Sequence, residues 1–197
     1  MKRMIVHILT ALYEPFWAAV VFSILVGCLH ICAKQISKDS TNEAKIIFKL
    51  FLSEIRNNKS FVIRLAYYFY IALILFRTLI NRNMWLNPLD NVLGVWGLFR
   101  NGEFTTEVIE NFILFIPFTF LRESIGKKSE SNKAGRIISR SFHSAFCFSI
   151  LIECLQLFLR LGTFELSDIF FNTIGGITGG IIVVFCNEIK ILRKRNG

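Results

Sequence analysis

Long apolar runs separated by segments rich in lysine and arginine constrain this 197-residue chain more than any other feature. A helix rises about 1.5 Å per residue and the hydrocarbon core of a bilayer is about 30 Å thick, so one crossing needs roughly 17–25 mainly apolar residues. Four runs have that length, at residues 16–33, 61–80, 141–161 and 169–186. We therefore predict an all-α membrane protein.

A fifth crossing is weaker in the sequence. Its solidly apolar part, residues 112–121, is short and contains Pro117. The segment predicts either a full crossing that begins near Thr105 or a re-entrant helix shielded by its neighbours. The distribution of charge decides between them, because loops rich in lysine and arginine stay in the cytoplasm.

Three basic segments, residues 34–60, 122–140 and 190–195, alternate with two more acidic ones, residues 81–110 and 160–168. Five crossings with the N-terminus outside would place every basic segment in the cytoplasm and both acidic ones outside. We therefore predict about five transmembrane helices, with the N-terminus outside and the C-terminus cytoplasmic. The net charge of +9 belongs to these loops, so we expect no nucleic-acid partner.

The chain divides into residues 1–60, an N-terminal transmembrane helix with a basic cytoplasmic loop, and residues 61–197, a four-helix transmembrane domain. The start of the chain looks like a signal peptide, but its apolar run lacks a small-residue cleavage site and is expected to stay in place. Apolar residues at helical spacing predict a cytoplasmic amphipathic helix within residues 34–60. Residues 84–99, which include Trp85 and Trp96, predict an external loop or interfacial helix.

Polar residues inside the apolar runs are the informative ones, since an ionisable group at the centre of a bilayer costs roughly 2.5–3.5 kcal/mol on insertion scales. Glu153, Gln156 and Arg160 follow one another at spacings of three and four, which predicts one helix face. Glu153 lies about 12 Å of helix inside the outer end of its run and is the acid expected to be buried most deeply. A carboxylate is not needed to glue helices together, which favours a functional role for it.

The last apolar run has a polar face of its own. Asp168, Asn172, Gly175 and Gly179 follow one another at spacings of four, three and four. The pairs Gly175/Gly179 and Gly176/Gly180 are small-xxx-small patterns that let another helix approach closely. The candidate functional or binding residues are Glu110, Asn111, Pro117, Glu153, Gln156, Glu165, Asp168 and Asn172.

Plainer interpretations stay open for several of these residues. Asp168 could simply favour a helix N-terminus after Ser167 as its cap. Asn172 and Gln156 could be interhelical hydrogen-bond glue. The five cysteines lie in or beside apolar runs without a C-x-x-C pair and are expected to be packing residues. No known nucleophile or phosphate-binding motif is present, so no catalytic residue is assigned, and we expect neither a metal nor a cofactor.

Five short motifs together resemble the VanZ-like family, which is linked to glycopeptide-antibiotic resistance. The resemblance runs from about Tyr67 to Phe185 and rests on FRTL at 76–79, NPL at 87–89, ENFILFIPF at 110–118, ECLQ at 153–156 and DIFFNTIGG at 168–176. Two departures stand out. Family members commonly show Asp-x-Asp-Asp where this chain has ELSD at 165–168, and Thr119 replaces a frequent glycine. These departures argue against a role that needs three carboxylates there.

The resemblance implies a multi-pass protein of a bacterial, Gram-positive plasma membrane. It further implies lowered susceptibility to lipoglycopeptides such as teicoplanin. The polar residues gather on the side of the two acidic segments, which predicts an action at the outer face of the membrane. The expected partners are membrane lipids together with a lipoglycopeptide or a lipid-linked envelope precursor, and a homo-oligomer is open. Two alternatives to this non-enzymatic role are an intramembrane enzyme acting on a lipid-linked envelope headgroup, with Glu153 or Asp168 as acid or base, and a small lipid transporter.

Overall fold

The computed structural model describes residues 15–36, 44–80, 84, 86–100, 103–125 and 134–195. Within these residues the chain is almost entirely helical, which confirms the all-α class. The helices are α2 (Phe16–Ile36), α3 (Ala44–Asn57), α4 (Lys59–Leu75) with its π-helical continuation η1 (Phe76–Ile80), α5 (Glu107–Ile125), α6 (Ala134–Leu159) and α7 (Leu166–Arg195). The strands β1 (Phe99–Arg100) and β2 (Glu103–Phe104) form a small antiparallel hairpin that the sequence did not suggest.

Among the described residues, four segments are long and apolar enough to cross a membrane, which confirms the four strong sequence predictions. They are Phe16–Lys34, Lys59–Leu79, Ala134–Leu159 and Leu166–Arg193. Helix α5 is not among them: it has 19 residues and carries Glu107 and Glu110 in its first turn and Arg122 in its last. Its Pro117 lies inside a continuous helix rather than ending it.

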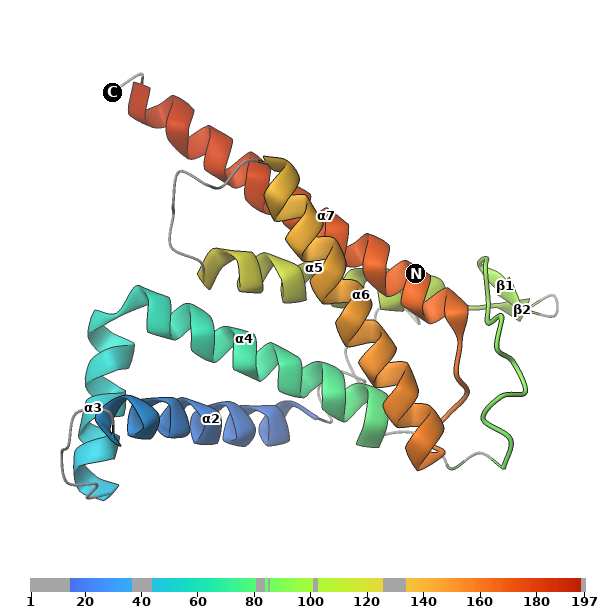
Figure 1. The fold of residues 1–197 in the computed structure, drawn as a ribbon, viewed down its shortest axis with the longest axis horizontal. Coiled ribbons are helices and arrows are strands. Elements are labelled where there is room, and N and C mark those ends of the chain that lie inside the picture. The colour runs from blue at the N-terminus through green and yellow to red at the C-terminus, as the bar shows by residue number, and fades with distance from the viewer. Residues whose placement is uncertain are drawn as a thin grey trace.

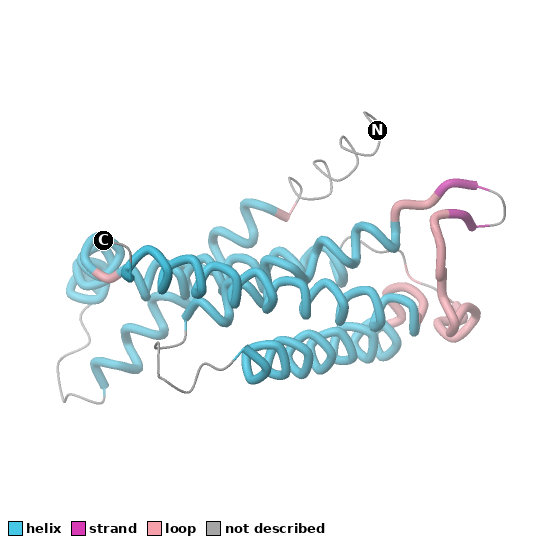
Figure 2. The backbone as a smooth tube through the Cα atoms, turned by 90° about the horizontal axis from the view of Figure 1, so that it is seen from above, coloured by secondary structure: helices cyan, strands magenta, loops and turns pink. Residues whose placement is uncertain are grey.

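Successive long helices run in opposite directions. Figure 1 shows α2, α4, α5, α6 and α7 passing in turn between the end of the molecule that carries α3 and the end that carries the hairpin, and Figure 2 shows the same course from above. The course of α5 is therefore the one that five crossings would require. The count of five and the sidedness of the two termini stay predictions, and residues 1–14 and Trp85 lie outside the described residues.

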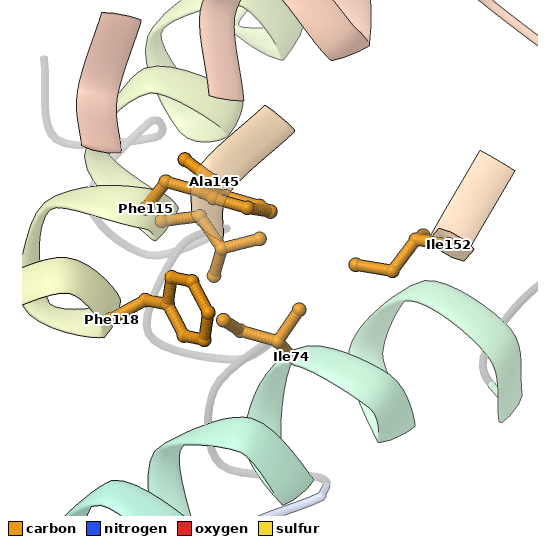
Figure 3. Packing of buried hydrophobic residues seen from close by; sticks show 6 residues of the cluster. Ile74, Phe115, Phe118, Ala145 and Ile152 are labelled. Atoms are coloured by element: carbon orange, nitrogen blue, oxygen red, sulfur yellow. The ribbon is translucent and has the colours of Figure 1, made fainter. Parts of the chain in front are cut away.

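The central core joins α4, α5 and α6. Figure 3 shows Ile74, Phe115, Phe118, Ala145 and Ile152 converging in this core. Phe118 stacks on Phe148 of α6 with ring centroids 4.8 Å apart, and the Tyr70 hydroxyl of α4 donates a 2.8 Å hydrogen bond to the Leu114 carbonyl of α5. In a bilayer such packing and interhelical hydrogen bonds hold helices together, because lipid tails are as apolar as the side chains.

Helix α7 is wedged between α5 and α6 through its two glycine pairs, as the small-xxx-small pattern predicts. A Cβ atom at Gly175 or Gly179 would lie 2.0 Å from the Phe112 carbonyl oxygen or 2.3 Å from the Ile116 carbonyl oxygen of α5. A Cβ atom at Gly176 or Gly180 would instead meet α6, at Ala145 or Ser141. Both stripes are thus covered within the chain, and they give no support to a homo-oligomer.

Helices α2, α3 and α4 form a separate corner. Phe51 of α3 packs edge-on against Phe61 of α4, with centroids 5.7 Å apart. The Lys34 ammonium at the end of α2 lies 2.9 Å from the Glu54 carboxylate of α3. This hydrogen bond and a second one from Asn58 hold the pKa of Glu54 below its usual value. The amphipathic helix predicted within residues 34–60 is confirmed as α3.

Candidate functional site

The turn between α6 and α7 shapes the candidate site. Helix α6 ends at Leu159, and Arg160 (φ 55°) and Gly162 (φ 123°) adopt left-handed backbone conformations that reverse the chain. Such a conformation is uncommon for a residue with a side chain. Arg160 is exposed in this turn. The prediction that it continues the helix face of Glu153 and Gln156 is therefore wrong.

Glu153 is buried at the end of α6, as predicted. It is 2% exposed, against 7% for Glu165. Its Oε2 accepts a 2.9 Å hydrogen bond from the backbone N–H of Glu165. Glu165 immediately precedes α7, so the carboxylate faces the partly positive N-terminus of that helix. The burial of an acid here is stabilised by the helix that carries the other candidate residues.

Glu165 anchors a segment made of successive turns, residues 87–95, onto the turn between α6 and α7. Its Oε1 accepts hydrogen bonds from the Thr163 hydroxyl at 2.7 Å and from Asn91 Nδ2 at 3.1 Å. Glu165 is thus a buried link between sequence positions 74 residues apart. Its long side chain reaches both donors from the residue that immediately precedes α7.

Backbone contacts hold the same segment in place. The N–H groups of Phe164 and Leu166 each donate a 2.9 Å hydrogen bond, to the carbonyls of Pro88 and Val92. The N–H of Val95 donates to Ser167 Oγ at 3.0 Å. Ser167 is the second residue of α7 and its hydroxyl binds this segment, so the reading of Ser167 as a cap for Asp168 is wrong.

Gly94 makes the close approach of this segment possible. Its φ of 72° is left-handed, and a Cβ atom there would lie 1.9 Å from Ser167 Oγ. The segment is thereby pressed against the start of α7. The side chains of Leu89 and Leu93 on it, and of Leu86 just before it, are exposed, and Trp96 packs against Phe170 with centroids 5.3 Å apart. This is an ordered loop, one of the two structures expected for residues 84–99.

Gln156 connects α6 to η1. It is 1% exposed, and its Nε2 donates a 2.8 Å hydrogen bond to the Thr78 carbonyl. Thr78 lies in the last turn of its helix, where carbonyl groups lack intrahelical N–H partners. A carbonyl can only accept a hydrogen bond, so the amide nitrogen Nε2 must face Thr78 and the amide oxygen Oε1 must point the other way. This oxygen has no hydrogen-bond partner in the described part of the chain. Short π-helical turns such as η1 occur frequently at functional sites.

Arg77, also in η1, pairs with Glu110 of α5. One of its guanidinium nitrogens binds Glu110 Oε2, and the Thr106 hydroxyl donates to Oε1 at 2.6 Å. Both charged side chains are about one-fifth exposed, 18% and 21%. The consecutive residues Arg77 and Thr78 of η1 thus contact two different helices: Arg77 binds Glu110 of α5, and Thr78 binds Gln156 of α6.

Asn172 joins α7 to α6 one level away from Glu153. Its Nδ2 donates a 2.8 Å hydrogen bond to Ser149 Oγ, four residues before Glu153 on α6. The side chain is buried, and Oδ1 has no hydrogen-bond partner among the residues described. The helical spacing of Asn172 therefore does direct it toward α6, as predicted.

The structure brings the candidates together unevenly. Glu153, Gln156, Glu165 and Asn172 form one buried cluster around the α6–α7 hairpin, which we call the hairpin cluster. Glu110 lies beyond η1, and Asp168 is half-buried in the first turn of α7. Asn111 and Pro117 are half-buried residues of α5. Within the described residues no group of three or more His, Cys, Asp or Glu side chains is placed to hold a metal ion.

The chemistry of the hairpin cluster is that of a hydrogen-bond acceptor. It contains the carboxylates of Glu153 and Glu165, which accept hydrogen bonds, and the amide oxygens of Gln156 and Asn172, which have no hydrogen-bond partner in the described part of the chain. Such oxygens favour a ligand that donates hydrogen bonds, for example an amine, an amide or a sugar hydroxyl. Leaving one of them unpaired costs about 1–3 kcal/mol, so a donor arriving there would gain that much.

Several residues that build the site escaped the sequence analysis. They are Thr78, Asn91, Ser149, Thr163 and the hydroxyl of Ser167. Thr78 contributes only a backbone carbonyl, which has no sequence signal. Arg77 could have been found, because an arginine near the end of one apolar run and Glu110 at the start of the next are a natural ion pair.

Fold and site together define a helical membrane protein with a buried polar cluster between apolar helices. The family model described as VanZ/LLP1 matches residues 16–187. The chain belongs to the VanZ/LLP1 family. The match begins in α2, well before the Tyr67 at which the sequence resemblance was placed. No match was found among curated proteins or among solved structures.

Proposed function

We propose that this protein is a multi-pass plasma-membrane protein that lowers susceptibility to lipoglycopeptides such as teicoplanin by acting at the outer face of the membrane. The hairpin cluster carries the proposal. It lies at the end of the molecule that holds the two acidic segments, the end expected to face outward. A lipoglycopeptide offers amine, amide and sugar hydroxyl donors, which complement the acceptors of the cluster.

The exposed leucines of residues 86–93 add a second element. They lie on the segment that Glu165 and Ser167 hold in place, so an apolar surface borders the acceptor cluster. A ligand that carries both a polar head and a fatty tail matches that combination. Vancomycin, which lacks the fatty tail, matches only the polar half.

The test is paired susceptibility of a sensitive Gram-positive host to teicoplanin and vancomycin, with and without the protein. We expect selective protection from teicoplanin. Glu153→Gln and Asp168→Asn should abolish it at unchanged membrane levels. Glu188→Gln makes the same chemical change at an exposed position of α7 and should protect fully. Full protection by Glu153→Gln would refute the hairpin cluster as the site, full protection by Asp168→Asn would exclude a role for Asp168 beside it, and no protection by the wild type would refute the function.

A second candidate function is an intramembrane enzyme that acts on a lipid-linked envelope headgroup. The deep burial of the Glu153 carboxyl favours it, since a buried carboxyl is well suited to acid or base catalysis. Purified protein would then turn over a labelled envelope lipid, and Glu153→Gln would stop the turnover. Binding of the lipid without turnover would leave the non-enzymatic proposal in place.

A further inference from the structure

Helix α3 runs across the ends of α2 and α4 rather than along them (Figure 1). Both of those helices belong to segments that can cross a membrane. An element that crosses their ends lies along the surface of the bilayer. With 14 residues α3 is about 21 Å long, too short to span the hydrocarbon core itself.

One stripe of α3 packs against the rest of the protein. Phe51 is 6% exposed and lies against Phe61 and the open face of Gly27, where a Cβ atom would come within 2.9 Å of its ring. Ile55, one turn later, packs in the same cluster. The Lys34–Glu54 ion pair lies beside this buried stripe and adds a second attachment to α2. Helix α3 is therefore docked in one orientation about its own axis.

The next stripe around the helix is apolar and uncovered. Phe48 and Leu52 are four residues apart, so they lie one above the other, and they are 60% and 51% exposed. Neither α2 nor α4 covers them. Apolar side chains gathered on one exposed stripe of an amphipathic helix are typical of helices that rest in a membrane interface.

A basic stripe follows the apolar one. Lys49 and Arg56, seven residues apart, lie on one face and are exposed, and Lys59 at the start of α4 is exposed nearby. The single acid of α3, Glu54, is already neutralised by Lys34. The free charge of this surface is therefore positive.

We propose that α3 binds the surface of an anionic bilayer. Phe48 and Leu52 enter the boundary between headgroups and acyl chains, while Lys49 and Arg56 bind lipid phosphates beside them. The order of the stripes around α3 supports this proposal. The buried stripe fixes the orientation of α3 about its axis, and the basic stripe borders the exposed apolar stripe on the side away from the buried one. Each lysine or arginine close to an anionic bilayer raises the affinity for anionic lipid about fivefold.

The first test locates the two faces of α3 in vesicles of phosphatidylcholine and phosphatidylglycerol. Single-tryptophan chains carry Phe48→Trp or, as the matched control on the far side, Ser53→Trp. We expect brominated acyl chains to quench the fluorescence at position 48 and aqueous acrylamide to quench it at position 53. Equal quenching of both positions by acrylamide would overturn the proposal.

The second test keeps the native tryptophans. Spin-labelled phosphatidylglycerol and phosphatidylcholine report which lipid the reconstituted full chain prefers. Replacing Lys49 and Arg56 by glutamine should lower the preference for phosphatidylglycerol, by up to about 30-fold at sites touching α3. Replacing Ser53 and Asn57 by glutamine, which leaves the charge unchanged, should not alter it. If replacing Lys49 and Arg56 left the preference for phosphatidylglycerol unchanged, binding of anionic lipid by the basic stripe would be refuted, and a protein would be the remaining partner for it.

Discussion

Replacing Gly175 by alanine should separate α7 from α5 and destabilise the protein. The added Cβ atom would lie 2.0 Å from the Phe112 carbonyl oxygen, about 1.4 Å closer than the 3.4 Å at which ordinary contacts begin. The obstructing atom belongs to the backbone, so no side-chain rotation can relieve the overlap. The two helices must move apart, and the packing along their whole contact loosens.

The magnitude follows from two opposing terms. Overpacking of a well-packed site costs typically about 1–3 kcal/mol, and a backbone obstacle places this site at the upper end. Alanine recovers about 0.5–1 kcal/mol relative to glycine inside a helix. The net loss is about 2 kcal/mol, which lowers the Tm of a chain of this size by about 4–8 °C.

Gly135 of α6 provides the matched control. A Cβ atom there would meet nothing within 4 Å, so Gly135→Ala has no steric cost and should raise the Tm, by less than the gain of about 1–4 °C expected in mid-helix because Gly135 lies in the first turn of α6. The measurement is thermal unfolding of the purified variants in one detergent, followed by circular dichroism. The two substitutions should shift the Tm in opposite directions. If Gly175→Ala raised the Tm as Gly135→Ala does, the close approach of α5 and α7 would be refuted.

Two further outcomes are expected. In a double-mutant cycle, Arg77→Met and Glu110→Met should each lower the free energy of unfolding by about 1–3 kcal/mol, and the double variant should lose less than their sum because neither charge is then left without its partner. Additive losses, measured by denaturant titration in mixed micelles, would mean that the ion pair is absent. Acid should loosen α3: the pKa of Glu54 is depressed in the folded protein, so its stabilising pairing with Lys34 is complete above pH 4.5 and is lost as the pH falls through the lower folded value. The protection factors of the α3 amides, which are corrected for the pH dependence of intrinsic exchange, should therefore fall below pH 4.5, whereas Glu54→Gln should lower them already at pH 6 and respond little to acid.

The helices themselves were largely predictable. Apolar runs of sufficient length report directly on crossings, because the bilayer sets one length for all of them. The glycine pairs of α7 were equally informative, since a stripe of small residues has one strong physical use between helices. The burial of Glu153 followed from its distance to the end of its run, and the structure confirms it.

The loop contacts of the site were not predictable in the same way. Glu165 meets Asn91 across 74 positions, and Val95 donates to Ser167 across 72, and helical periodicity carries no information at such separations. Arg160 was placed on the face of Glu153 because spacing alone cannot show where a helix stops. The stop depends on left-handed backbone at Arg160 and Gly162, and only the glycine signals it in advance.

The way α7 packs explains why the polar cluster forms where it does. Gly176 and Gly180 let the backbone of α7 approach α6, and the same closeness brings Asn172 within 2.8 Å of Ser149 and the backbone before α7 within 2.9 Å of Glu153. A cluster that only glued helices would be expected to satisfy its own atoms, since each unpaired buried acceptor costs about 1–3 kcal/mol. Gln156 and Asn172 instead keep carbonyl oxygens without described partners. These unpaired oxygens lower the stability of the fold but can accept hydrogen bonds from a ligand, as the proposed binding role requires.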